Sequence, residues 1–424
     1  MYNMKKMRAV LAALAACGIL SAGTALAAPV ELTLEDSVNL ALENNPQVKI
    51  AMLDEMKAEA SLDEAEANRG FTLGYVHNAG RSKMEGFTAE NSFSNGLTLS
   101  LPLYTGGRLE NAIDAAEIAL ESAKLGVNDT RQQLRMDTTN SYYSILQAQN
   151  QVTIYQQTVE SLEEHLRNVK AQYHVGTVAK SDVLRSEVEL ADAQQGLIKA
   201  ENARDLSVSN FNNVVGLPLD TDVRVTEELG YEKYDLVLAD CIAYALEHRA
   251  DGKQAQLAID AAEEYKSIAK SGYRPSITAS ASNGWSDSDF PGTEDESWQI
   301  GAKLSWNIFD MGATKAQVRQ ADADLLTAKE LARQKLDAIQ LEVRMAYLDV
   351  HEAEKRIHTS QVSVDKAEED LKIAHVRYRA GVGTNLDVMD AQVALTTAKM
   401  NYVQSLYDYN TSKAELDRAM GISI

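Results

Sequence analysis

Two kinds of hydrophobic spacing alternate along the chain, and each predicts a different element. Residues 97–103 read Leu-Thr-Leu-Ser-Leu-Pro-Leu, and residues 298–308 also place apolar side chains at every second position. This period of two is typical of a strand with one apolar and one polar face. Weaker alternation at 71–75 and 277–281 precedes each segment, across loops rich in Gly, Ser, Asn and Asp. The sequence therefore predicts two hairpins and four strands, at about residues 70–104 and 275–309.

A second pattern, with apolar residues spaced alternately four and three apart, predicts a coiled-coil seam on a long helix. No proline interrupts residues 103–217, and the 66 residues from Gly107 to Tyr173 make a helix of about 100 Å. Shorter helical stretches at about 34–68 and 180–213 are expected to run beside it, end to end. A compact helical bundle is the alternative, which this length disfavours. The seam comprises Tyr155, Val159, Leu162, Leu166, Val169 and Tyr173, with the equivalents Ser360, Val364, Ala367, Leu371, Ala374 and Tyr378.

The chain repeats itself at an offset of 205 residues. The segment that starts at Tyr173 matches the one that starts at Tyr378, and the offset holds from Leu99/Leu304 to Gly216/Gly421; upstream it becomes 204. Such a period is far longer than a solenoid repeat, so it indicates a duplicated half-molecule. We expect the first structural repeat at 28–220 and the second at 221–424.

The N-terminus has the features of a secretory signal peptide at residues 1–27. Basic residues precede an apolar core, and Ala25-Leu26-Ala27 forms a small-x-small cleavage site. The alternative is a lipobox, in which Cys17 is lipidated and becomes the mature N-terminus. Cleavage after residue 27 leaves Cys241 as the only cysteine, so an intramolecular disulfide is excluded.

The net charge and the lack of an apolar membrane helix restrict the functions that the chain can have. Loss of three basic signal residues changes the formal charge from −21 to −24, which excludes nucleic acid as a favoured partner. No apolar run after the signal reaches the ~20 residues of a membrane helix, so membrane entry requires the strands. Four strands cannot close a barrel, and an open edge is not tolerated in lipid, so several chains must share one barrel. The alternative is a soluble helical rod capped by hairpins, although the three tryptophans of the second strand region suit a bilayer interface.

Catalytic and metal-binding patterns are absent from the sequence. His351 and His358 are seven residues apart and lack a clear third ligand, so we predict no metal site. The glycine-rich segments complete no phosphate-binding pattern, and no nucleophile motif is present. We therefore predict a protein that is not an enzyme and that has no cofactor.

With these features the chain resembles the TolC-like outer membrane efflux protein family, the outer membrane factors. The resemblance covers the mature chain and includes the motif Y-x-x-G-x-x-x-x-x-D-V at both helix turns, which starts at Tyr173 and Tyr378. It implies a mainly α fold with a membrane β-barrel portion: a homotrimer whose duplicated long helices form a coiled-coil α-barrel and whose four strands per chain close a 12-stranded barrel. It also implies an exit duct in the outer membrane of a diderm bacterium, with a large periplasmic portion. The implied partners are outer-membrane lipid, a periplasmic adaptor (membrane fusion) protein and an inner-membrane pump of the resistance-nodulation-division or ABC type.

The resemblance also assigns a gate at the periplasmic tip. Asp387 and Asp390 match the two aspartates that form cation-binding rings, and their i,i+3 spacing places both on one helix face. Asp182 and Tyr378 match a latch between neighbouring helices, although Asp182 is equally suited to be a helix cap. The tips where adaptor hairpins dock are Val175, Gly176, Thr177, Ala380, Gly381 and Val382.

One position departs from the family. Gly383 stands where members with a second latch carry an arginine, so its hydrogen bond to Ser181 is absent, and the closed state is either weaker or held by other contacts.

A different kind of protein, a periplasmic adaptor or coiled-coil scaffold outside the membrane, is the main rival, but it leaves the alternating segments unexplained. The transported substrate and the class of pump stay open.

Overall fold

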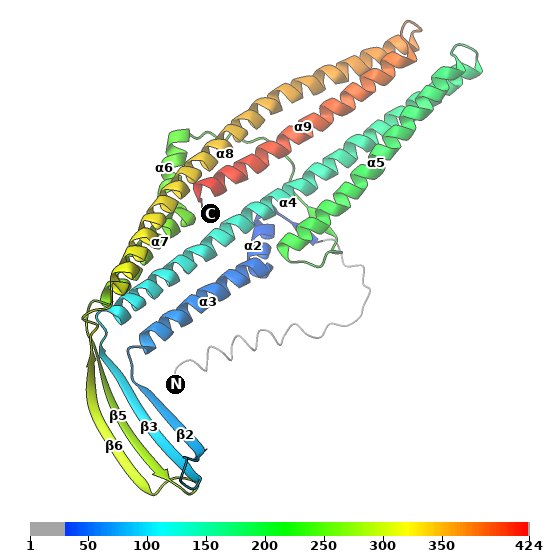
Figure 1. Ribbon diagram of the computed structural model, residues 1–424. Coiled ribbons are helices and arrows are strands. Elements are labelled where there is room, and N and C mark those ends of the chain that lie inside the picture. The colour runs from blue at the N-terminus through cyan, green and yellow to red at the C-terminus, as the bar shows by residue number, and fades with distance from the viewer. Residues whose placement is uncertain (1–29, 423–424) are drawn as a thin grey trace.

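The computed structural model describes residues 30–422, so the predicted signal peptide and Cys17 lie outside the described residues. The molecule is an elongated, bent rod, with helices along most of its length and a single four-stranded sheet at one end (Figure 1). This agrees with the predicted separation of helical and strand segments.

The helices occur in two sets of four with identical lengths. Each set has helices of 11, 22, 67 and 36 residues in the same order, as the duplication requires. The 67-residue members confirm the predicted long helix and are far longer than a compact bundle uses. The first set is α2 (Leu34–Asn44), α3 (Pro46–Ala67), α4 (Arg108–His174) and α5 (Lys180–Val215); the second is α6 (Leu238–His248), α7 (Ala250–Ser271), α8 (Ala313–Arg379) and α9 (Asn385–Met420).

The predicted stretch at 34–68 is in fact two helices, because the chain turns at Asn45 and Pro46. Asn45 has an extended backbone, its side chain accepts a hydrogen bond from the Gln47 amide, and its Nδ2 donates to the Val214 carbonyl at 2.8 Å. Proline at the first helical position then starts α3. As expected, α3 and α5 both pack along α4 and together cover much of its length (Figure 1).

The sheet joins the two halves of the chain. Its strands are β2 (Thr72–Ser82), β3 (Glu90–Tyr104), β5 (Ser276–Asp287) and β6 (Asp295–Ser305), in the antiparallel order β2-β3-β5-β6. All four predicted strands are therefore present, and β3 pairs with β5 across the repeat boundary. The outer edges of β2 and β6 pair with no other strand within residues 30–422.

The end of the last strand differs from the prediction. Alternation continues to Ile308, but β6 ends at Ser305, and the side chain of Asp310 then organises the turn into α8. The Asp310 carboxylate accepts hydrogen bonds from the amides of Gly312 and Thr314 at 2.9 and 2.8 Å. Trp306 and Ile308 therefore lie in the connection to α8.

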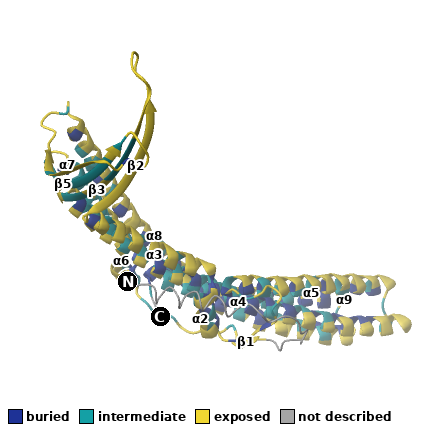
Figure 2. Cartoon of the chain, turned by 90° about the horizontal axis from the view of Figure 1, so that it is seen from below, coloured by how far each residue is buried: buried dark blue, intermediate teal, exposed yellow. Residues whose placement is uncertain are grey.

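Both faces of the sheet are open in the single chain. Every residue of β2 is exposed (Figure 2), and the large apolar side chains of β6, Trp298, Ile300 and Leu304, are exposed as well. The helical region, by contrast, contains many buried residues, and they lie where the helices pack against one another (Figure 2). None of the helices in residues 30–422 is long and apolar enough to cross a membrane.

Two equivalent cores hold the middle of the rod. In the first half, Tyr142 and Phe211 are completely buried, and the Tyr142 hydroxyl donates to the Leu32 carbonyl at 3.2 Å. A second core is built around Ile339, Val343 and Tyr409. The first core also contains a short parallel pair that the sequence analysis missed, β1 (Val30–Leu32) with β4 (Val223–Val225).

Candidate functional site: the helical tips

Each half ends in a sharp turn between its long helix and the following helix. Gly176 and Gly381 adopt φ values of 79° and 75°, as predicted for these turns. The next residues, Thr177 and Val382, donate backbone hydrogen bonds to carbonyls five residues earlier, each at 3.0 Å, which closes a compact helix end. The six predicted docking residues are exposed here: Val175, Gly176, Thr177, Ala380, Gly381 and Val382.

Asp387 and Asp390 are both exposed on the first turns of α9, but they have different surroundings. The Asp387 carboxylate accepts a hydrogen bond from the Thr384 amide at 2.9 Å, and the Thr384 hydroxyl accepts one from the Asp387 amide. This capping box lowers the pKa of Asp387, so its carboxylate stays ionised at neutral pH. Asp390 faces α5 instead, where its charge and that of Asp192 add to burial in raising the pKa of Glu189.

The structure brings Tyr378 and Asp182 near each other without joining them. Tyr378 is buried, and its hydroxyl has no hydrogen-bond partner. Burial, together with the charge of Asp182, raises the Tyr378 pKa. Among the described residues the Asp182 carboxylate accepts no hydrogen bond, so the expected latch bond is not made in this conformation. The capping alternative for Asp182 is also wrong, because the N-cap of α5 is Ala179 and no side chain caps that helix.

The departure at Gly383 has a steric reason. Its amide donates to the Arg377 carbonyl at 3.1 Å, and a Cβ atom there would lie only 3.0 Å from Arg377 Cβ and 3.1 Å from the Arg377 backbone. A larger residue at this position requires these neighbours to move by a few tenths of an ångström.

A buried polar network that the sequence analysis missed connects the two helical hairpins. His165 of α4 bonds through Nε2 to Asn385 Oδ1 at 2.6 Å. Asn385 Nδ2 in turn donates to the Asp182 carbonyl and to Ser186 Oγ of α5, both at 3.2 Å. Asn385 thus holds the start of α9 against α4 and α5, directly beside Tyr378. Only its position at a helix start hinted at this role, because its partners are about 200 residues away.

Aromatic rings surround this network. The His165 ring lies 5.2 Å from the Tyr378 ring and 5.7 Å from the His375 ring, measured between centroids. These side chains line a groove of about 640 Å³ between α4 and α8. Burial lowers the pKa of both histidines, and their mutual repulsion lowers that of His375 further, while Glu164 opposes the shift.

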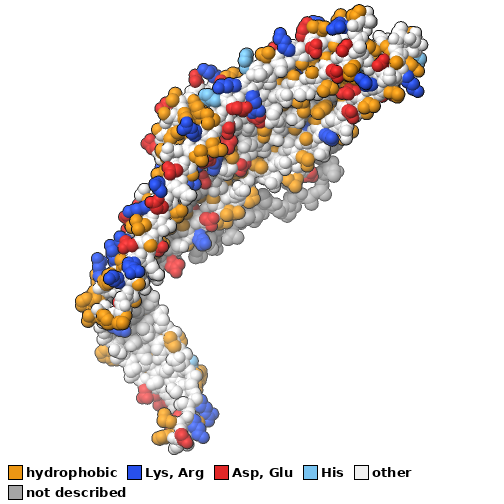
Figure 3. Space-filling model, turned by 45° about the horizontal axis from the view of Figure 1, so that its top comes forward, with side chains coloured by type: hydrophobic (Ala, Val, Ile, Leu, Met, Phe, Trp, Pro, Cys, Tyr) orange, Lys and Arg blue, Asp and Glu red, His pale blue; other side chains and the backbone are white. Residues whose placement is uncertain are grey.

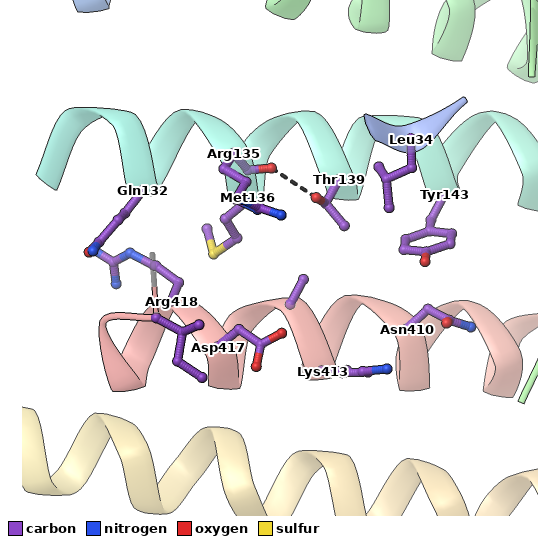
Figure 4. Close-up of a pocket in the computed structure, with 12 residues that line it drawn as sticks. Leu34, Gln132, Arg135, Met136, Thr139, Tyr143, Asn410, Lys413, Asp417 and Arg418 are labelled. Carbon is purple, nitrogen blue, oxygen red and sulfur yellow. Dashed lines mark hydrogen bonds between the residues drawn. The ribbon is translucent and has the colours of Figure 1, made fainter. Parts of the chain in front are cut away.

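A second cavity, of about 190 Å³, lies between α4 and α9 near the middle of the rod (Figure 4). Its charged groups have partners: Asp417 accepts a hydrogen bond from Tyr234, and Arg418 pairs with Glu342. Lys413 lies 5.0 Å from the centre of the Tyr234 ring. We interpret this cavity as part of the structural core. Within the described part of the chain, no group of three or more His, Cys, Asp or Glu residues could hold a metal ion.

Comparison with known proteins follows the same division into halves. A profile of the family described as outer membrane efflux protein matches residues 37–217 and 241–422. Outer membrane protein TolC of Escherichia coli (strain K12) is 23% identical over 402 residues, covering 89% of this chain and 80% of the relative. Alkaline protease secretion protein AprF of Pseudomonas aeruginosa is 25% identical over 430 residues, covering 92% of this chain and 85% of the relative.

Solved structures share the fold. The Campylobacter jejuni CmeC outer membrane channel has a TM-score of 0.81 at 18% identity, covering 92% of this chain and 85% of that chain. The open state of the Neisseria gonorrhoeae MtrE outer membrane channel has a TM-score of 0.79 at 19% identity, covering 92% and 88%.

A four-stranded sheet at the end of duplicated long helices is therefore a fold that this chain shares with solved outer-membrane channels. The chain belongs to the outer membrane efflux protein family. It is therefore an outer-membrane exit duct of the efflux and secretion kind, and these matches indicate no family of enzymes.

Because His165 and His375 favour the neutral form, we predict that acid weakens the contact between the two helical hairpins, α4–α5 and α8–α9. Because the folded-state pKa of His165 and of His375 is lowered, the unfolded or opened form takes up protons first. Stability is thus present above pH about 6.5 and is lost as the pH falls. We expect hydrogen exchange at the start of α9, corrected for intrinsic rates, to increase below that pH.

His165→Phe combined with His375→Phe should remove this pH dependence, whereas His358→Gln, at an exposed histidine of α8, should leave it unchanged. Asn385→Ala should increase exchange at every pH, because an unpaired buried imidazole costs about 1–3 kcal/mol. Equal exchange on both sides of pH 6.5 in the unaltered protein would contradict the argument.

Proposed function

We propose that three copies of the chain close a twelve-stranded barrel that continues into a helical tunnel. The observation that carries the proposal is the pair of open edges on β2 and β6, at the base of rods about 100 Å long. Open sheet edges are not tolerated in lipid, so the edges of neighbouring copies must pair. Three chains supply the twelve strands, because each contributes four.

In this assembly the helical tips lie in the periplasm and receive partners. The exposed turns at Gly176 and Gly381 dock a periplasmic adaptor protein, which connects the channel to an inner-membrane pump of the resistance-nodulation-division or ABC type. The names of relatives support both uses, since AprF is an alkaline protease secretion protein and SrpC of Pseudomonas putida is a solvent efflux pump outer membrane protein. The channel is a passive conduit, and contact with the partner selects its open state.

The gate lies at the start of α9. Three copies bring six carboxylates of Asp387 and Asp390 around the axis, where they attract cations. The capping box lowers the pKa of Asp387. It therefore opposes the rise in pKa that repulsion among the carboxylates of the ring would cause. Tyr378 and Asp182 form the latch when the tip closes. The buried hydroxyl without a partner supports this role, since such a group gains a hydrogen bond from a small movement.

The rival, a scaffold that never enters the membrane, fits less well. The family profile covers both halves, including both hairpins, and the relatives that match nearly the whole chain are outer membrane proteins.

The oligomer can be measured directly. Mature protein extracted from outer membranes in mild detergent should have a protein mass of three chains by light scattering. It should also run as a heat-modifiable band on gels. A stable monomer with the β3 and β6 segments folded as helix would contradict the barrel.

The aspartate rings predict cation preference in planar bilayers. Asp387→Asn with Asp390→Asn should reduce cation selectivity and weaken block by divalent cations, while asparagine still provides the capping oxygen at position 387. Asp54→Asn with Asp63→Asn removes the same charge from exposed positions on α3 and serves as the control. Unchanged selectivity in the first double variant would mean that the rings are misassigned.

If Tyr378 and Asp182 hold the tip closed, loss of their hydrogen bond should let ions leak through the channel. Tyr378→Phe should raise the basal conductance, because a hydrogen bond to a carboxylate contributes about 1.5–3 kcal/mol, which shifts the closed–open equilibrium about tenfold or more. The repeat supplies a matched control in Tyr173→Phe, at the equivalent but exposed tyrosine of the first half. Equal basal conductance in the two variants would count against the latch.

A further inference from the structure

The connection between the sheet and the second long helix exposes a dense apolar cluster. The apolar face of β6 does not stop at the strand end but continues into four further apolar residues, three of which are more exposed than any apolar residue of the strand. The exposed fractions are 54% for Trp306, 83% for Ile308, 82% for Phe309 and 86% for Met311. Four such side chains over six residues need a partner, since water is a poor environment for them.

This connection is held in a defined shape. The Trp306 indole donates a hydrogen bond to the Tyr273 carbonyl at 3.0 Å, which fixes the start of the segment against the end of α7. The Asp310 carboxylate fixes its other end through the amides of Gly312 and Thr314. Met311 has φ +54°, the only positive φ of a non-glycine residue within 30–422. Such a conformation persists only where neighbours enforce it, and it is typical of functional segments.

Basic residues surround the same cluster although the protein is strongly acidic. Segments 266–276 and 303–319 contain six Lys or Arg residues and one acidic residue, Asp310, whose carboxylate is already engaged. In the space-filling view, basic and hydrophobic side chains gather together at the bend between helices and sheet (Figure 3). Four of the basic residues are exposed and form no ion pair within the described part of the chain: Lys270, Arg274, Lys315 and Arg319.

Both long helices also begin here, after Gly107 and Gly312. Each helix start has a side-chain acceptor, because the Thr105 hydroxyl accepts a hydrogen bond from the Leu109 amide and the Asp310 carboxylate accepts one from the Thr314 amide. The first turn of α8 contains Lys315 and no acidic residue, so the charge of Lys315 adds to that of the neighbouring basic residues.

The opposite end of the same hairpin has the reverse charge. Residues 287–296, at the far turn between β5 and β6, contain five acidic residues and no Lys or Arg. The two ends of this hairpin therefore carry opposite charges, whereas the far turn of the other hairpin contains both basic and acidic residues, Arg81, Lys83 and Glu85. The 11 residues of β6 match the ~9–11 of a tilted spanning strand, and the apolar cluster begins one residue beyond it.

We propose that this region, the junction collar, binds anionic phospholipid headgroups in the periplasmic leaflet of the outer membrane. The apolar side chains enter the leaflet at headgroup depth, and the basic side chains contact the phosphates. The inference rests on the proposed orientation, with the sheet across the membrane and the helices in the periplasm. The junction collar consists of Tyr273, Trp306, Ile308, Phe309 and Met311 with Lys270, Arg274, Lys315 and Arg319.

Spin-labelled lipids test the headgroup preference. Mature full-length protein is reconstituted in phosphatidylethanolamine vesicles, and the retention of labelled phosphatidylglycerol is compared with that of labelled phosphatidylethanolamine. We expect phosphatidylglycerol to be preferred at low salt. Lys270→Gln with Lys315→Gln should lower the preference about twofold to fivefold per charge. Lys57→Gln with Lys199→Gln, at exposed lysines on α3 and α5, should not change it.

A second measurement tests what covers the apolar side chains. A bimane label at Phe309→Cys should be quenched by brominated lipid in the same vesicles. Absence of quenching would show that lipid does not cover the cluster, and it would overturn the proposal. Absence of any phosphatidylglycerol preference, or equal loss in both double variants, would overturn it too. Conductance of the same samples separates these outcomes from failure of the channel itself.

Discussion

The unpaired backbone N–H and C=O groups at the two outer edges of the sheet need hydrogen-bond partners, and the rest of the proposed structure follows from this requirement. In a bilayer no water reaches the outward N–H and C=O groups of β2 and β6, and each unsatisfied group costs several kcal/mol. A single chain satisfies only the inner edges, through the β2–β3, β3–β5 and β5–β6 pairs. Pairing between copies satisfies the others, and it also brings the long helices together around one axis. The pore and the tunnel thus have one physical origin in the proposed trimer.

Duplication makes this arrangement possible with few specific contacts. Helices of equal length in the two halves produce rods of equal length, so the tips end at the same level. Near the tips, the two hairpins are joined by an apolar cluster that includes Val169, Val183 and Val388, and by the polar contacts of Asn385. The hydrogen bonds of Asn385 demand exact positions, so they fix how the start of α9 sits against α4 and α5. In the proposed channel, this contact is the one that opening of the tip would change.

Acidic and basic side chains gather in different parts of the molecule, and in the proposed assembly these parts have different surroundings. Acidic side chains lie at the start of α9, where three copies would surround a water path, whereas unpaired basic side chains gather where helices meet sheet. The two sets are separated by the length of the helices, far beyond the ~10 Å over which salt allows charges to interact. In the proposed assembly each set therefore acts locally: one on permeating ions, and the other on lipid headgroups.

The sequence by itself determined the strands, the duplication and the length of the helices. Alternation with period two, a repeat offset and the absence of proline are properties of the order of residues alone, so they can be recognised without a structure. The tertiary structure decided the rest. The three-residue strands β1 and β4 carry no periodic signal, and the end of β6 depends on the Asp310 carboxylate, although the apolar alternation continues past it. The contact of His165 with Asn385 and the missing bond between Asp182 and Tyr378 depend on how helices distant in sequence pack, because hydrogen bonds demand positions accurate to a fraction of an ångström.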